Sequence, residues 1–442
     1  MRYLPHTDGD VSRMLAAIGL DSIDGLFASI PSNLRLNGEL KLPPPLDENA
    51  LQRLLTDLAG KDKPSLCFAG GGAYWHYIPA AIDHLLRRSE FYTSYTPYQP
   101  EISQGTLQAI FEFQTMVARL LGMEVVNASM YDGATATAEA VLMAMRATQR
   151  KKALVSHGLH PQFLKTLRTY SKWVDLELVQ LPLDQSGQTD IAAMSQAVDD
   201  QTACVVVQSP NYLGVIENTP AIAKAFQTQK TRFIHVFTDA LAFGLITPPG
   251  AAGAHIACGE GQALGIPLSF GGPYLGLFAV TKNDVRNMPG RVVGETVDAE
   301  GRRAFCLTLS TREQHIRREK ATSNICTNEG LMALAATIYM ALMGRQGMQK
   351  VARLNRAKAE YMKAELGKVA TLPFAAPTFH EFVWIPKVPV QKVLHDLHRE
   401  GIAAGIPLVG FAPELENAIL TCVTEMISRK EIDRYVEIVR SM

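Results

Sequence analysis

Between residues 66 and 321 the sequence alternates short apolar runs with stretches in which apolar residues recur at helical spacing. The apolar runs lie at 153–155, 176–179, 203–207, 233–237 and 276–280. Short apolar runs separated by helices favour a mainly parallel sheet with helices on both of its faces. The sequence therefore predicts a large α/β domain, which we place at residues 63–326.

The segments on either side predict two smaller parts. Residues 1–62 have helical spacing at 12–18 and 23–30, followed by three prolines that enforce an extended stretch. They predict an N-terminal helical arm that wraps a neighbouring subunit. Residues 327–442 begin with an apolar helix and continue with strand and helix patterns, which predict a smaller C-terminal α+β domain.

Composition excludes several classes of protein. The 442 residues include 43 Lys plus Arg and 43 Asp plus Glu, giving a net charge of zero, and there is no dense basic block. We therefore expect no nucleic-acid partner. An apolar content of 47% with only 19% charged residues indicates a surface partly covered by another subunit.

The cysteines and the hydropathy pattern indicate the compartment. Six scattered cysteines without a CxxC pair predict reduced thiols, no disulfide and no metal site. The first ten residues lack a secretory signature, and no run of about 18 uncharged apolar residues offers a membrane span. We expect a cytoplasmic protein with no membrane segment.

Four polar segments follow one another in the order in which enzymes that use pyridoxal phosphate (PLP) hold their cofactor. Ser129 and Asp132 lie in a loop that opens an alanine-rich helix, where free amides can bind a phosphate. Asn211 follows the strand at 203–207. Asp239 follows the next strand, where an acid keeps the pyridine nitrogen protonated. Each feature alone is an ordinary cap or turn, but their order indicates a cofactor-type site at one sheet edge.

The fourth segment lacks the lysine that such enzymes need. No lysine occurs between Lys230 and Lys282, although the cofactor lysine is expected roughly two dozen residues after Asp239. Gln262, or a residue beside it, takes that place, and a glutamine cannot form the covalent link. Lys282 follows a glycine-rich turn and a further strand, so it is either a displaced substitute or a solvated loop lysine.

A separate segment, residues 91–101, combines aromatic residues, prolines and polar groups. It includes Tyr95, Tyr98 and Gln99, and its prolines exclude a regular helix or a central strand. Aromatic side chains with polar tips suit a cleft that is wet on one side. We expect this segment at the surface or at a subunit boundary.

Several longer runs, more specific than any short motif, carry a family resemblance. They lie at 91–108, 127–133, 265–276, 289–294 and 318–327. On these runs the chain resembles, from end to end, the P-protein of the glycine cleavage system, in the subunit 1 or alpha form of the split enzyme. The resemblance implies the aminotransferase-like fold, fold type I of the PLP-dependent enzymes.

The resemblance also implies a division of labour. A second, beta subunit carries PLP on its lysine, and the holoenzyme, a heterotetramer, decarboxylates glycine and passes the aminomethyl group to the lipoyl arm of H-protein. Tyr95, Tyr98 and Gln99 then become candidate contributors to the partner's active site. A pseudo-cofactor site would be marked by Ser129, Asp132, Asn211 and Asp239.

Two other functions compete with this interpretation. One is a self-sufficient PLP lyase or transferase that uses Lys282 or another lysine. The other is a lysine-less scaffold or regulatory protein without a catalytic partner. Addition of PLP to the chain, and assembly with a lysine-bearing homologue, would separate the three.

Overall fold

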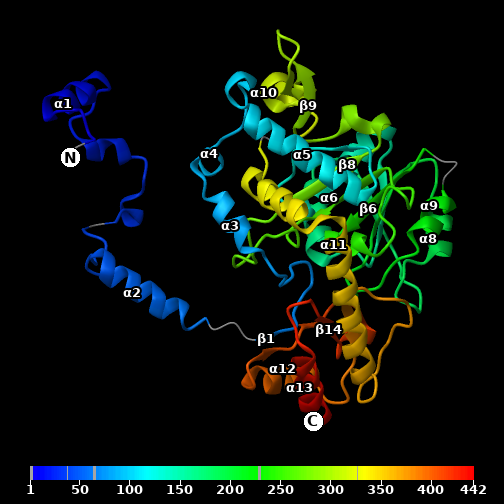
Figure 1. Ribbon diagram of the computed structural model, residues 1–442. Helices are drawn as coiled ribbons and strands as arrows, with labels where there is room; N and C mark the ends of the chain where they lie inside the picture. The colour runs from blue at the N-terminus through cyan, green and yellow to red at the C-terminus, as the bar shows by residue number, and fades with distance from the viewer. Residues whose placement is uncertain (1–2, 37, 63–65, 227–229, 326) are drawn as a thin grey trace. The chain divides into compact units, whose positions relative to one another are not determined.

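The computed structural model describes residues 3–36, 38–62, 66–226, 230–325 and 327–442 (Figure 1). The chain forms two compact units, Met1–Lys63 and Pro64–Met442. No helix in the described residues combines the length and the apolar character that crossing a membrane requires.

The first unit contains two α-helices, α1 (Asp8–Ala17) and α2 (Glu48–Ala59), and two short 3₁₀ helices, η1 (Ile23–Phe27) and η2 (Ser32–Leu34). Helix α1 begins earlier than the sequence pattern suggests because Thr7 and Asp10 form a reciprocal cap. Helix α2 contains no buried residue. Its exposed leucines recur at the spacing of one helical face: Leu51, Leu54, Leu55 and Leu58.

A seven-stranded sheet organises the second unit. Its order is β2 (Val125–Val126), β8 (Gly276–Val280), β7 (Ile256–Glu260), β6 (Arg232–Phe237), β5 (Thr202–Gln208), β3 (Lys152–Ser156) and β4 (Glu177–Leu181). The strands from β7 to β4 are parallel, whereas β8 is antiparallel to both of its neighbours. The predicted mainly parallel sheet is confirmed. Strand β8 is the exception, because residues 261–275, which connect it to β7, contain no crossover helix.

Helices cover both faces of this sheet (Figure 1). One face packs against α6 (Gly133–Thr148) and α7 (Pro161–Ser171). The other packs against α5 (Gln104–Leu121) and α11 (Gly330–Leu366), with α8 (Ile191–Ala197) and α9 (Thr219–Ala225) further along the sheet. Alternate strand residues face the two layers, so the central strands are mostly apolar on both faces.

Shorter elements surround these layers. They are α3 (Ala80–Leu86), α4 (Ser89–Tyr92), η3 (Pro100–Ile102), η4 (Ala240–Gly244), η5 (Lys282–Asn287), η6 (Ser310–Arg312), α10 (Gln314–Arg317) and η7 (Arg318–Lys320). An antiparallel hairpin, β9 (Val292–Val297) and β10 (Arg303–Thr308), packs against α5.

The C-terminal part is built on a small antiparallel sheet of β11 (Glu381–Trp384), β14 (Ile419–Cys422) and β13 (Ile406–Pro407). Helices α12 (Val390–Arg399) and α13 (Arg429–Arg440) and the turn η8 (Pro413–Leu415) complete it. Trp384 and Tyr435 are fully buried in its core.

The expected boundary at 326/327 falls just before α11, a helix that contacts both parts. It packs against α5 in the large layer and, beyond a kink at Gly344, against α13. Residues 66–67, which were expected in the large domain, form β1 (Leu66–Cys67) and pair in parallel with β12 (Ile402–Ala403). The backbone bond from Leu66 N to Gly401 O draws this segment to the C-terminal part.

Candidate functional site

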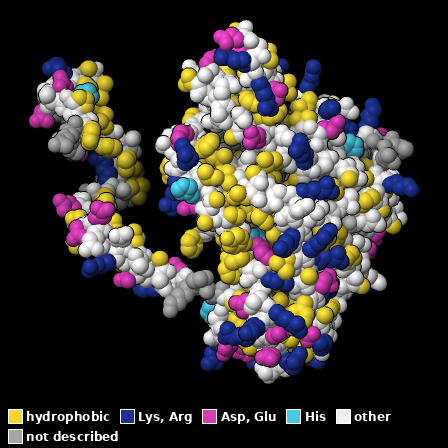
Figure 2. Space-filling model, viewed as in Figure 1, with side chains coloured by type: hydrophobic (Ala, Val, Ile, Leu, Met, Phe, Trp, Pro, Cys, Tyr) yellow, Lys and Arg dark blue, Asp and Glu magenta, His cyan; other side chains and the backbone are white. Residues whose placement is uncertain are grey.

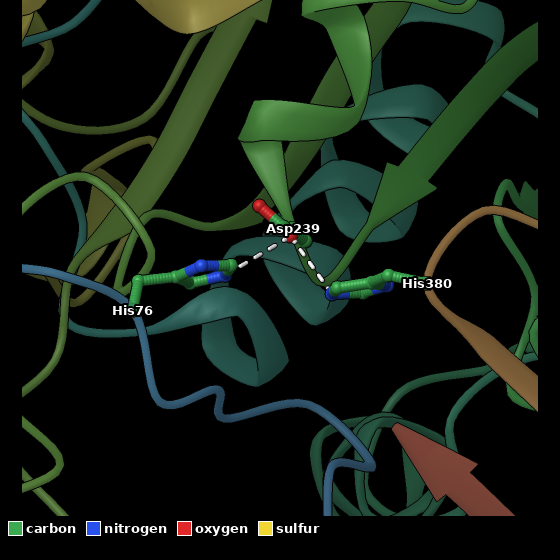
Figure 3. Close-up of side chains that lie close together, drawn as sticks. All are labelled: His76, Asp239 and His380. Atoms are coloured by element: carbon green, nitrogen blue, oxygen red, sulfur yellow. Dashed lines mark ion pairs between the residues drawn. The ribbon is translucent and has the colours of Figure 1, made fainter. Parts of the chain in front are cut away.

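Asp239 lies buried between two histidines immediately after β6. Its Oδ1 accepts a 2.8 Å hydrogen bond from Leu241 N and caps η4. Its Oδ2 lies 3.4 Å from His76 Nε2 and 3.0 Å from His380 Nε2, and Figure 3 shows the two rings approaching it from opposite sides. All three side chains are only 2% exposed.

The charges in this cluster reinforce one another. Burial raises the pKa of the Asp239 carboxyl, but His380 and His76 outweigh burial and hold it below its ordinary value. Burial lowers the pKa of His76, whereas Asp239 and Glu425 outweigh that cost and raise it to about 9. Glu425 Oε2 lies 2.8 Å from His76 Nδ1. The site therefore favours a positive charge between its carboxylates.

Gln262 lies buried in the turn after β7, where its amide joins two segments. Its Oε1 accepts a 2.8 Å bond from Tyr74 N, and its Nε2 donates to Tyr74 O at 3.0 Å and to Ile266 O at 2.7 Å. Both amide donors are thus used. Gln262, at the position expected for a cofactor lysine, therefore holds the segment around Tyr74 against the turn after β7.

Glu260 ends β7 and places a carboxylate at the start of α6. It accepts hydrogen bonds from four backbone amides, those of Gly133, Gly261, Gln262 and Leu275, at 3.0–3.1 Å. Burial raises the pKa of this carboxyl to about 7, and the amide bonds act in the opposite direction. Glu260 was not predicted from the sequence, because the strand that it ends was not recognised.

Tyr74 occupies the space between these groups. Its hydroxyl lies 2.9 Å from Thr238 Oγ1 and donates to Glu381 Oε2 at 2.8 Å. Its ring centroid lies 4.6 Å from that of His380. The segment that carries Tyr74 therefore runs along the strand ends and contacts both the turn after β7 and the surroundings of the cluster.

The other predicted pseudo-site residues have local partners. Asp132 caps α6 through a 2.7 Å bond from Thr135 N, and Ser129 Oγ accepts from Asn328 Nδ2 at 3.0 Å. Asn211 Nδ2 donates to Gly187 O at 2.8 Å and to Glu217 Oε1 at 2.9 Å. Among the described residues, no hydrogen bond joins Ser129, Asp132, Asn211 and Asp239 to one another. They share a sheet edge, but each serves its own loop.

The three candidate residues of the aromatic segment, Tyr95, Tyr98 and Gln99, lie in different environments. Tyr95 is 78% exposed and lines a cavity of about 210 Å³ bounded by residues 91–97, α5 and the start of α11. Tyr98 is instead anchored, since its hydroxyl accepts a 3.0 Å bond from Arg291 Nη2. Gln99 is exposed and does not line this cavity. Asn328, which does, is the residue that bonds Ser129.

A family model described as "Glycine cleavage system P-protein" matches residues 1–439. The chain belongs to this family. A P-protein relative from Geobacillus kaustophilus is 51% identical over 439 residues, 98% of each chain, and one from Moorella thermoacetica is 50% identical over the whole of both. Both are named "Probable glycine dehydrogenase (decarboxylating) subunit 1". The predicted family is confirmed.

Solved structures agree with this placement of the P-protein chain. A crystal structure of "glycine decarboxylase (P-protein) of the glycine cleavage system, in inhibitor-bound form" matches with a TM-score of 0.87 and 41% identity over 100% of both chains. A sphingosine-1-phosphate lyase from Burkholderia pseudomallei matches with a TM-score of 0.68 and 15% identity, covering 93% of this chain and 94% of the lyase, which shows the fold alone. The predicted aminotransferase-like fold is confirmed.

Proposed function

We propose that the chain is the alpha subunit of a two-polypeptide glycine dehydrogenase (decarboxylating). It acts with a beta subunit that carries PLP on a lysine, in a heterotetramer that decarboxylates glycine and loads the aminomethyl group onto lipoylated H-protein. The full-length similarity to relatives named subunit 1 supports the assignment. The observation that carries the division of labour is the hydrogen-bonded Gln262, which has no amine to offer.

The pseudo-site does not fit PLP, because its own side chains use the positions that three parts of that cofactor would need. The Glu260 carboxylate takes the α6 amide that would face a phosphate. His76 and His380 stand at Asp239, where a pyridine nitrogen would bind. Gln262 takes the place of the lysine. When bound to the partner, PLP supplies the electron sink for decarboxylation, and this chain supplies fold and interface.

Lys282 gives the self-sufficient alternative little support. Its side chain is 77% exposed at the start of η5, and its Nζ lies 3.8 Å from Glu124. An exposed lysine beside a surface carboxylate is in solvent, whereas a cofactor lysine must lie inside the site that holds the cofactor. The solvated-loop interpretation therefore explains its surroundings fully.

Exposed apolar side chains support a partner surface on this subunit. Figure 2 shows apolar side chains gathered over α3 and the start of α11, and Leu85, Tyr92 and Tyr95 are among the exposed residues of this region. Contiguous exposed apolar surface marks interaction sites. We assign this face, with its cavity at Tyr95, to the beta subunit, and we assign the leucine face of α2 to the same partner.

Two measurements on the full chain test the assignment. The purified chain, mixed with PLP and treated with borohydride, should show no reducible visible band and no cofactor attached to protein. Co-expressed with a lysine-bearing homologue, it should form a stable complex with glycine–bicarbonate exchange activity dependent on lipoylated H-protein. A covalent adduct on the isolated chain would establish the self-sufficient enzyme, and an intact homologue active without this chain would favour the scaffold.

The aromatic segment gives a separate prediction. Tyr95→Phe or Gln99→Ala should lower the exchange rate about 10-fold, or ~1.4 kcal/mol of transition-state stabilisation, while the complex stays intact. The reason is that both side chains are exposed and free to extend into a neighbouring site. Tyr170→Phe, the same change on α7, should have no effect. Wild-type rates in both variants, with the complex intact on size-exclusion chromatography, would show that the segment does not enter the site.

A further inference from the structure

Three buried atoms at the centre of the pseudo-site have no hydrogen-bond partner among the described residues. They are His76 Nε2, Asp239 Oδ2 and His380 Nε2. The contacts of 3.0 and 3.4 Å that join them are close in distance but lack hydrogen-bond geometry. Buried polar atoms are nearly always paired, so three unpaired atoms at one point require an explanation.

The remaining atoms of two of these side chains are held so that the unpaired ones face inward. Asp239 Oδ1 is fixed by Leu241 N, which leaves Oδ2 directed at the rings. His76 Nδ1 lies 2.8 Å from Glu425 Oε2, and Glu425 itself accepts a 2.7 Å bond from Tyr77 N. A carboxylate behind a histidine is the arrangement that fixes the tautomer and orientation of a metal-binding imidazole.

The separations suit a common central ion. The three ligand atoms all lie within 4.8 Å of one another, and two of their separations are 3.0 and 3.4 Å. Bonds of about 2.0–2.2 Å to a four- to six-coordinate ion place adjacent ligand atoms about 3.0–3.5 Å apart. The two contacts of Asp239 Oδ2 match these separations, and the third, between the two histidine nitrogens, is within 4.8 Å.

The buried carboxylates of the cluster and the cavity beside it are consistent with a bound cation. Asp239 and Glu425 are carboxylates with little exposure, and among the described residues both ion pairs of Asp239 involve histidines rather than lysine or arginine. A buried carboxylate needs a compensating positive charge. His76 and Gln262 also border a cavity of about 430 Å³, so one of the three ligand residues lies beside space from which an ion could approach.

We propose that His76, Asp239 and His380 form a binding site for a divalent transition-metal ion, with Zn²⁺ as the best match for two imidazoles, one carboxylate and an open position. The site goes beyond the proposed function, since glycine decarboxylation does not require it. It also departs from the absence of a metal site predicted from sequence. That prediction relied on short motifs, whereas these ligands come from three segments that only folding brings together.

Metal uptake by the full chain tests the proposal. After removal of metal with a chelator, the chain should bind one Zn²⁺ by calorimetry, and Co²⁺ should give a visible d–d absorption band. Asp239→Asn and His380→Gln should weaken Zn²⁺ binding by more than ~100-fold, and Glu425→Gln, behind His76, by about 10- to 100-fold with unchanged stoichiometry. His84→Gln, an exposed histidine on α3, is the matched control and should bind as wild type.

Each outcome decides the question. Asp239→Asn keeps the side-chain oxygen that accepts from Leu241 N, so a folded variant is available if His380→Gln fails to fold. Folding is checked by thermal unfolding without metal. A folded wild-type chain that takes up no Zn²⁺ and gives no Co²⁺ band would overturn the proposal and leave a protonated histidine as the cation. Unchanged affinity in Asp239→Asn would do the same. Neither result alters the exchange assay of the complex, so the proposed function is judged separately.

Discussion

We expect Glu260→Ala to lower the free energy of unfolding by about 4 kcal/mol or more. The substitution removes a carboxylate that accepts from four backbone amides inside a buried turn. Gly261 N keeps a second acceptor, Leu275 O at 2.7 Å, so among the described residues the other three donors are left without a partner. Each buried donor left without a partner costs about 1–3 kcal/mol. Glu260→Gln keeps a carbonyl oxygen for most of these donors and should cost only about 1–3 kcal/mol. Urea unfolding followed by circular dichroism would rank the three proteins.

The pH dependence of stability, compared between wild type and Glu260→Gln, gives a second test of this prediction. Burial raises the pKa of Glu260 to about 7 in the folded chain, from an ordinary value of 4.5. Folding therefore binds a proton between these values, and the stability from this group is present below pH 4.5 and is lost as pH rises through 7. The advantage of wild type over Glu260→Gln should shrink between pH 5 and 8. An advantage that grows over this range would mean that the amide bonds outweigh burial.

Small anions provide a check on the cause. Formate restores a carboxylate to the cavity left by Glu260→Ala, so it should raise the thermal midpoint of that variant and leave Glu260→Gln unaffected. A loss of stability that formate does not reverse, together with an equal loss in Glu260→Gln, would show that the four amides do not depend on this carboxylate.

The sheet could be predicted from sequence because its strands are buried on both faces. The runs expected at 203–207, 233–237 and 276–280 correspond to β5, β6 and β8, whose residues are apolar with few exceptions. Strand β7 was missed, since Gly259 and Glu260 interrupt its apolar run. The pairing of β1 with β12 was also missed, because two-residue strands far apart in the chain leave no periodic pattern.

The residues of the site also fall into those that the sequence could predict and those that it could not. Asp239 was predicted because it directly follows a readable strand, and it does lie at the centre of a buried cluster. Its partners His76 and His380 come from an irregular segment and from the residue before β11, so no local pattern links them to it. Side chains that are far apart in the chain and meet only in the folded structure, such as Tyr74 and Glu381, cannot be paired from sequence spacing. Strand ends could be predicted, but not the side chains that meet there.

Gln262→Lys should not convert the chain into a PLP enzyme. The new amine would lie where Gln262 now bonds Tyr74 N, Tyr74 O and Ile266 O, with Glu260 and Tyr74 already occupying the adjoining space. The variant should give no borohydride-reducible visible band with PLP. It should also lose about 1–3 kcal/mol of stability, because Tyr74 N loses its buried acceptor.

Gln262→Met is the matched control for that loss. It is neutral, similar in length and equally unable to accept from Tyr74 N, so it should lose that bond without adding a charge. It also loses the bonds to Tyr74 O and Ile266 O, which a lysine can still donate. Gln262→Lys should be the less stable of the two at pH 7, since burial disfavours an ammonium. If Gln262→Lys instead bound PLP covalently at near-stoichiometric levels, the pseudo-site would be an open cofactor pocket that lacks only its lysine. Such binding would refute the claim that Glu260, His76 and His380 take the positions that PLP would need, because the cofactor would then fit beside them.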